Sequence, residues 1–170
     1  MSILGTLRTS APYHLLLYSV LFGSTTYQSF FSGIVAFKVL PYDQFSLLQS
    51  HVFPPYFKFQ TAATSVLLMT TPLKYMPLAG PSLGISLVGS IANMLWLGPT
   101  TRDIQNRRRE QEAKEGKSCK DPNVSDEMKA INKEFGKIHG YSVIFNMGTF
   151  LGLLVYGIGL SQKLIRVIPK

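Results

Sequence analysis

The stretch from residue 11 to residue 37, APYHLLLYSVLFGSTTYQSFFSGIVAF, indicates the fold class, because it contains no Lys, Arg, Asp or Glu over 27 residues. A helix needs about 20 apolar residues to cross the hydrocarbon core of a bilayer. Pro12 suits the first turn of such a helix, where its missing N–H leaves no hydrogen bond unmade. The stretch therefore predicts a first membrane-spanning helix.

Three further segments, residues 59–73, 82–101 and 140–162, are also free of charged side chains. Lys58 and Lys74 flank the first of them, and long basic side chains can reach the lipid headgroups from inside a span. The chain is therefore predicted to be an all-α integral membrane four-helix bundle in a single domain, residues 1–170. The predicted spans are 11–39, 55–76, 81–99 and 139–162, with a tight turn at Pro77, Gly80 and Pro81.

The charged residues are segregated, although the mean hydropathy of +0.16 is mild for a membrane protein. Eight of the nine acids and ten of the 17 Lys and Arg lie between Arg102 and Lys137. A soluble domain would place charges on every exposed helix face. The remaining bases flank apolar segments, so the formal net charge of +8 favours lipid headgroups over nucleic acid as the partner.

Two polar segments connect the spans. Residues 40–54 are too polar to span and place apolar side chains at helical spacing, which predicts a short interfacial helix between Pro41 and the pair Pro54–Pro55. Residues 100–138 predict a charged helical hairpin. In it, a helix ends at Glu115, Gly116–Asn123 forms a loop, and Ser125 caps the next helix.

The distribution of basic residues predicts the orientation. With four spans, five Lys and Arg lie on the side of the two termini and twelve on the other side. The positive-inside rule then places the odd-numbered loops in the cytoplasm or its equivalent. An endomembrane and a mitochondrial membrane both remain open.

Small residues recur at four-residue spacing in the spans, which favours close packing of helices, since helices in a bilayer associate through backbone approach and interhelical hydrogen bonds. This pattern predicts a compact bundle and leaves room for a homo-oligomer or a membrane-protein partner. The pairs are Ser29 and Gly33, Gly80 and Gly84, Ser86 and Ser90, and Gly148 and Gly152.

Polar side chains within the spans predict a polar layer near the loop face. Asn93 lies six residues before Pro99 and Asn146 six after Gly140, about 9 Å inside that face at 1.5 Å per residue. Such a layer either stabilises the association of the helices through hydrogen bonds or forms the path of a substrate or ion. The candidate residues are Gln28, Gln60, Asn93, His139, Ser142 and Asn146.

Candidates for enzymatic or cofactor chemistry are few. His51 and His139 share the loop face and are weak candidates for metal or haem ligands. Cys119 is the single cysteine and is expected to be an exposed, dispensable thiol. The sequence carries none of the common soluble-enzyme motifs, and Asp43 is the one acid outside the large loop. We therefore expect no enzymatic activity and no cofactor.

Several short motifs resemble those of the transmembrane protein 205-like family, a group of uncharacterised eukaryotic membrane proteins. Phe45-Ser-Leu-Leu-Gln49 continues to Phe53-Pro54-Pro-Tyr56-Phe57, and further matches lie at Ser29-Phe30 and Gly33, Asn93, Pro99-Thr100, Arg107-Arg108 and Glu112, and from Phe135 through His139-Gly140-x-Ser142 to Asn146. The resemblance covers most of the chain and implies four spans. It implies no reaction.

These observations leave three functional hypotheses. The first is a non-enzymatic membrane protein that organises the membrane or binds a partner. The second is a carrier of a small molecule or ion that uses the polar layer. The third is a haem- or metal-binding protein that uses His51 and His139.

Overall fold

The computed structural model describes residues 3–165, and all regular structure in that part of the chain is helical, which confirms the prediction of an all-α fold. Two of the elements, η1 and η3, are π-helical turns that interrupt longer helices, and η2 is a 3₁₀ turn. The elements are α1 (Ile3–Leu7), α2 (Ala11–Tyr27), η1 (Gln28–Ser32), α3 (Gly33–Val39), α4 (Tyr42–Thr70), η2 (Leu73–Tyr75), α5 (Met76–Ala92), η3 (Asn93–Leu97), α6 (Gly98–Glu115) and α7 (Asp126–Ile165).

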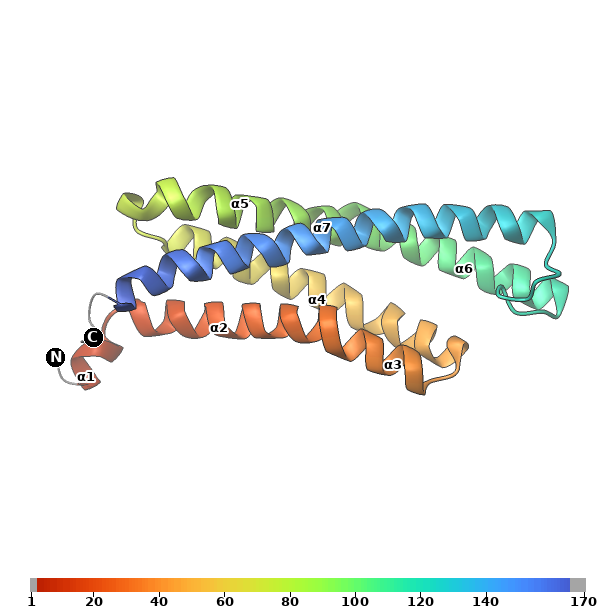
Figure 1. Cartoon of the computed structure of the whole chain (residues 1–170), viewed down its shortest axis with the longest axis horizontal. Helices are drawn as coiled ribbons and strands as arrows, with labels where there is room; N and C mark the ends of the chain where they lie inside the picture. The colour runs from red at the N-terminus through yellow and green to blue at the C-terminus, as the bar shows by residue number, and fades with distance from the viewer. Residues whose placement is uncertain (1–2, 166–170) are drawn as a thin grey trace.

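The long helices lie side by side (Figure 1). Helices α2 and α3 form one rod through η1, and α5 and α6 form another through η3. Helices α2 and α5 each pack against both α4 and α7. Helix α1 and the end of α7 lie at one end of the molecule, and the loop between α6 and α7 lies at the other (Figure 1).

Two helical segments, Ala79–Glu115 and Asp126–Gln162, are long and apolar enough to cross a membrane, by length and composition. Large apolar side chains also cover the outward faces of the long helices. Examples are Leu16, Val88 and Ile144, whose exposed fractions are 62%, 62% and 65%. Monomeric soluble proteins rarely expose contiguous apolar patches of more than a few hundred Å².

Helices α5 and α7 pack closely through small residues. A Cβ atom on Gly152 would collide with Ser86 and with the backbone of Ser82, and one on Gly89 would lie 2.5 Å from the carbonyl oxygen of Phe145. The hydroxyl of Ser86 donates to the carbonyl of Thr149 over 3.0 Å, and the Thr149 hydroxyl donates to the carbonyl of Ser86 over 3.2 Å. This reciprocal pair requires two backbones in close approach.

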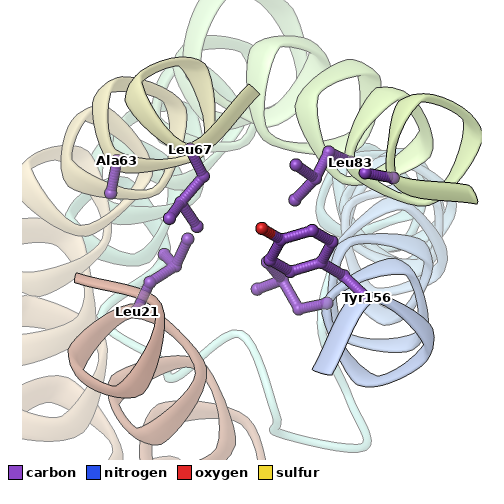
Figure 2. Close-up of a cluster of buried hydrophobic side chains, with 7 residues drawn as sticks. Leu21, Ala63, Leu67, Leu83 and Tyr156 are labelled. Atoms are coloured by element: carbon purple, nitrogen blue, oxygen red, sulfur yellow. The ribbon is translucent and has the colours of Figure 1, made fainter. Parts of the chain in front are cut away.

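Apolar side chains from α2, α4, α5 and α7 meet at the end of the molecule near the termini (Figure 2). Leu21, Leu67 and Leu83 are fully buried there, and Tyr156 is 6% exposed. This cluster therefore holds the four helices together at that end. Its other members are Ala63, Ala79 and Leu153.

The structure corrects the helix boundaries predicted at prolines. Pro54 and Pro55 lie inside the continuous helix α4, so no separate interfacial helix ends there. Each proline removes one backbone hydrogen bond of the helix, so Pro54 and Pro55 leave the carbonyls of Ser50 and His51 without their usual amide donors. Both residues line an open pocket beside α6. The helix nevertheless continues through both prolines to Thr70.

The predicted turn at Pro77, Gly80 and Pro81 is also wrong, because these residues lie in the first turns of α5. Helix α4 ends at Thr70 rather than at Met76, and the chain reverses over residues 71–75. Pro77 occupies the helix start, where no amide donor is needed. Pro81 follows one turn later inside the same helix, where it leaves the carbonyl of Pro77 without an amide partner.

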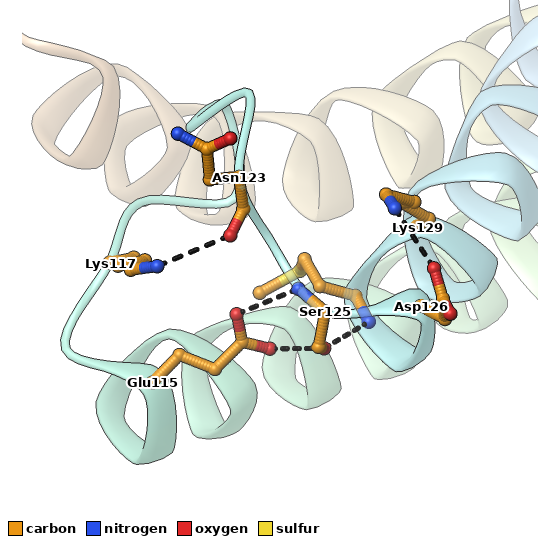
Figure 3. Close-up of polar contacts among 7 residues, drawn as sticks. Glu115, Lys117, Asn123, Ser125, Asp126 and Lys129 are labelled. Atoms are coloured by element: carbon orange, nitrogen blue, oxygen red, sulfur yellow. Dashed lines mark hydrogen bonds and ion pairs between the residues drawn. The ribbon is translucent and has the colours of Figure 1, made fainter.

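The predicted helical hairpin is confirmed. Helix α6 ends at Glu115, and the following Gly116 has a φ of 64°, which glycine adopts readily. Ser125 caps α7, since its hydroxyl accepts the amide of Met128 at 3.1 Å. Glu115 closes the loop by accepting from both the amide and the hydroxyl of Ser125, at 3.1 and 2.5 Å (Figure 3).

Cys119 is buried rather than exposed, with 3% of its surface accessible. Its side chain packs with Val124 and Met128 in a small core at the tip of the hairpin. The Cys119 carbonyl accepts from Asn132 over 2.8 Å. Burial raises the pKa of the thiol, so the thiolate that would react is disfavoured at neutral pH. The expectation of an exposed, dispensable thiol missed this packing role.

Candidate functional site

A buried polar cluster joins α2, η1, α4 and α7 midway along the molecule. Gln60 is at its centre, fully buried, and its amide nitrogen lies 2.8 Å from the Tyr56 hydroxyl, 3.2 Å from that of Thr25 and 3.3 Å from Oδ1 of Asn146. Asn146 in turn donates from Nδ2 to the Ser29 hydroxyl over 2.8 Å. Five polar side chains from segments far apart in sequence thus form one network, which we call the Gln60 cluster.

A second polar contact joins η3 to α7. The Ser142 hydroxyl donates to Oδ1 of Asn93 over 2.6 Å, and Nδ2 of Asn93 donates to the Ser142 carbonyl over 3.2 Å. Asn93 is fully buried. Because Ser142 lies one helical turn before Asn146 on α7, this pair and the Gln60 cluster are neighbouring layers.

Both polar groups lie at π-helical turns. Ser29 belongs to η1, and Asn93 is the first residue of η3. A π-helical turn widens the helix by one residue, changes the direction of its side chains and often marks a functional site. Directly after η3, a Cβ on Gly98 would lie 2.5 Å from the Asn93 carbonyl, so glycine suits this position. The two turns place Ser29 and Asn93 toward α7.

One end of the Gln60 amide has no partner within the described residues. Its oxygen is buried and unpaired while its nitrogen faces three acceptors. Turning the amide over would let the Tyr56 and Thr25 hydroxyls donate to the oxygen, but would leave the nitrogen unpaired instead. A buried group of this kind usually bonds to a water or a ligand. The hydroxyl of Thr64, one turn along α4, is also buried and unpaired.

The structure brings together four of the six predicted polar-layer residues in two pairs, Gln60 with Asn146 and Asn93 with Ser142. Gln28 belongs to η1, but its amide nitrogen is buried without a partner in the described part of the chain. His139 does not join the layer. Its ring is exposed and stacks on Phe135 at a centroid distance of 5.5 Å.

The motif residues of the loop face have mixed positions. Tyr56 enters the Gln60 cluster, and Phe53 stacks on Phe57 at 5.4 Å. The Thr100 hydroxyl donates to the Trp96 carbonyl over 2.9 Å. Gln49 lies on α4 with a buried, unpaired amide oxygen, while Pro54 and His51 line an open pocket and Pro99 lies in the first turn of α6.

His51 and His139 do not form a metal centre in the described residues, where no group of three or more His, Cys, Asp or Glu side chains is close enough to hold an ion. The ring nitrogen Nδ1 of His51 bonds to the carbonyl of Leu47 at 2.9 Å. His139 stacks on Phe135, as described above. The haem or metal hypothesis thus gains no support from this geometry.

The predicted polar layer lacked three members of the Gln60 cluster. Thr25 was not singled out, Ser29 was predicted as a small packing residue, and Tyr56 entered only through the family resemblance. Sequence reasoning also missed a polar network near the termini. There His14 bonds through its two ring nitrogens to Thr70 and Tyr156, and Tyr156 in turn lies 3.5 Å from the Thr71 hydroxyl.

Arg108 is the most deeply buried basic residue of the hairpin, with 6% of its surface exposed. Its guanidinium donates to Asn132 at 2.9 Å and to the Tyr42 hydroxyl at 3.0 Å, and lies 4.3 Å from the centre of the Phe135 ring. These contacts tie α6 to α7 and to the start of α4. Burial outweighs the nearby positive charge and raises the pKa of Tyr42, which keeps the hydroxyl neutral.

Comparison with known proteins places the chain in a family. Residues 16–110, more than half of the chain, match the family described as a domain of unknown function, DUF4149. The chain belongs to the DUF4149 family. The match includes Thr25, Ser29, Tyr56, Gln60 and Asn93, and ends before Ser142 and Asn146 on α7.

A curated relative of this DUF4149 protein is Xanthocillin biosynthesis cluster protein D from Aspergillus fumigatus. It is 28% identical over 169 residues, and the alignment covers 97% of each chain. No solved structure matches the chain.

Proposed function

We propose that this DUF4149 protein is a non-enzymatic, four-span integral membrane protein that binds a protein partner through the α6–α7 hairpin. The apolar outward faces of α2, α5 and α7 support immersion in lipid. The resemblance to the transmembrane protein 205-like family supports four spans. The count of basic residues supports a cytoplasmic position, or its equivalent, for the hairpin.

The observation that carries this proposal is that the hairpin is an ordered, packed extension of the helices. Helix α7 has 40 residues, about 60 Å at 1.5 Å per residue, whereas the hydrocarbon core is about 30 Å thick. The part of α7 that exceeds this thickness is capped by Ser125 and packs in a small core around Met128. Arg108 links the hairpin to α4 by a hydrogen bond to Tyr42. A tether between two spans needs none of these features, so the hairpin suits a binding surface.

Exposed lysines indicate the chemistry of the partner. Lys129, Lys133 and Lys137 are exposed at four-residue spacing on α7, so they form one stripe along the hairpin. Lys129 bonds to Asp126 over 2.9 Å. Lys133 and Lys137 remain available for an acidic surface, on a second copy of this chain or on another membrane protein.

The proposal is tested with the double variant Lys133→Glu/Lys137→Glu, expressed in the native host and extracted in mild detergent. Native electrophoresis or native mass spectrometry of the wild type is expected to show a discrete complex heavier than the 18.9 kDa chain. The variant is expected to migrate as the free chain, because like charges repel the acidic surface. Membrane integration is checked by alkaline extraction.

Lys114→Glu, compared with the single variant Lys133→Glu, is the matched control, since Lys114 is exposed in the same hairpin and the charge change is equal. Lys117 is left unchanged, because its side chain donates to the Asn123 carbonyl over 3.2 Å. The control is expected to keep the complex. A wild type that is only ever a free chain would contradict partner binding, as would equal loss of the complex in both variants.

A second candidate, a carrier for a small polar molecule, is favoured by one observation. The unpaired end of the Gln60 amide and the unpaired Thr64 hydroxyl offer hydrogen bonds within the buried layer. A relative named for a biosynthesis cluster is compatible with handling of a small molecule. Solute flux into proteoliposomes that disappears in Gln60→Met would favour this function over partner binding.

A further inference from the structure

A basic pocket opens between α4 and α6 at the base of the hairpin. It has a volume of about 410 Å³, within the range of about 300–1,000 Å³ that is usual for small-molecule sites. Arg102, Gln105 and Arg109 line one wall, and Ser50 and His51 line the other. No Asp or Glu in the described residues lines it. We refer to it as the Arg102 pocket.

The spacing along α6 explains the wall of the pocket. Arg102, Gln105 and Arg109 follow at intervals of three and four residues, so they share one face of the helix. Arg109 also donates to the Ser46 hydroxyl over 3.3 Å and lines a neighbouring pocket with Asp43 and Glu112. Arg102 is exposed and forms no ion pair in the part of the chain described. Of the two arginines that line the pocket, Arg102 is therefore the one whose positive charge is less compensated by acidic side chains.

The position of the pocket relates it to the lipid surface. Arg102 is the first charged residue after 27 uncharged ones, residues 75–101, and thus marks the end of that apolar segment. Ser50 and His51 lie two turns before Lys58, at the corresponding end of the apolar part of α4. Both walls lie where phospholipid phosphates are found if these segments cross the bilayer.

We propose that the Arg102 pocket binds the phosphate of an anionic phospholipid headgroup. Arginine presents a planar set of donors that matches two phosphate oxygens, and two such side chains on one wall suit a phosphodiester. Gln105 donates one of its two amide hydrogens to the Ser46 hydroxyl over 2.6 Å, which leaves one further donor at the same opening. This inference rests on the proposed membrane location, and it assigns to the base of the hairpin a role distinct from that of the lysine stripe.

The test measures lipid adducts on the full chain. Purified protein in a charge-neutral detergent is titrated with phosphatidylglycerol or phosphatidylcholine, and native mass spectrometry counts the bound lipid. The wild type is expected to bind phosphatidylglycerol at least about tenfold more tightly, because both lipids carry a phosphate but phosphatidylcholine also carries a cation. Arg102→Gln/Arg109→Gln is expected to abolish that preference.

Arg107→Gln/Lys114→Gln is the matched control, because it removes the same charge from another face of α6. Both residues are exposed, and neither lines the pocket. The control is expected to keep the preference to within about twofold. The single variants Arg102→Gln and Arg109→Gln, each expected to weaken it, serve if the double variant does not fold.

Three outcomes would overturn the inference. The first is equal binding of the two lipids by the wild type, and the second is equal loss of preference in pocket and control variants. The third is displacement of phosphatidylglycerol by millimolar inorganic phosphate, which would identify a free phosphate site instead. Failure of the chain to integrate into phosphatidylcholine nanodiscs would reject the membrane location itself, and this is recognised before any lipid titration.

Discussion

At the scale of single residues, Gln60 shows how the packed helices accommodate a buried amide. Its nitrogen is surrounded by hydroxyl and carbonyl acceptors from α2, α4 and α7, whereas its oxygen has none in the described residues. Interhelical hydrogen bonds of this kind contribute on average about 0.6 kcal/mol in membrane proteins. The cluster therefore contributes modestly to stability and leaves one polar group available.

The link between Gln60 and Asn146 can be measured with a double-mutant cycle of Gln60→Met and Asn146→Leu. We expect each variant to lower the free energy of unfolding, with a coupling of about 0.6 kcal/mol, because the two side chains share a hydrogen bond. The measurement is equilibrium unfolding in mixed micelles. Strict additivity would contradict a structural link and would leave ligand binding as the role of these amides.

The residues of this cluster were only partly predictable. Depth counting along each segment placed Asn93 and Asn146 near one level, since an α-helix rises by a constant 1.5 Å per residue. The same counting cannot find η1 and η3, where the insertion of one residue changes which side chains face inward. It therefore included Gln28, which bonds to none of the other five, and omitted Thr25 and Ser29.

At the scale of helices, the pattern of small residues carried more information than the prolines. Prolines gave two wrong helix boundaries, because the rule for proline assumes that a lost hydrogen bond ends a helix. Helix α4 nevertheless continues through the pair Pro54–Pro55, and at Pro77 helix α5 has only begun. Among the predicted small-residue pairs, Ser86 and Gly152 lie at the close contact of α5 with α7, whereas a Cβ on Gly84 would meet nothing within 4 Å.

Gly152 provides the test of that packing. Gly152→Ala is expected to destabilise the protein by about 1–3 kcal/mol, because its Cβ would collide with Ser86 and the backbone of α5, which cannot move without separating the helices. Gly148→Ala is the matched control one turn away, where the nearest atom is 3.9 Å distant. The control should be neutral or slightly stabilising, as alanine favours helix. Equal unfolding midpoints in detergent for both variants would contradict tight packing of α5 on α7.

At the scale of the whole molecule, charge and apolar surface are separated along the long axis. Exposed apolar side chains cover α2, α5 and the later part of α7, whereas most of the charged residues lie in the hairpin. Figure 1 shows the hairpin at the end of the molecule opposite the termini. The Arg102 pocket lies at the junction of the two regions. This separation is what a protein with one part in lipid and one part in water requires.

The arrangement predicts a specific topology, in which the connections at residues 40–41 and 116–125 lie on one side of the membrane and residues 71–75 lie on the other. The test places single cysteines at Pro41, Asn123 and Leu73 in a Cys119→Ser background and labels intact vesicles with an impermeant maleimide. Pro41 and Asn123 should label from the same side, and Leu73 from the opposite side, because α4 and the segment 79–115 would then each cross once. The alternative is that only the segments Ala79–Glu115 and Asp126–Gln162 cross the membrane. Leu73 and Pro41 would then label from the same side, and the four-span arrangement would be rejected.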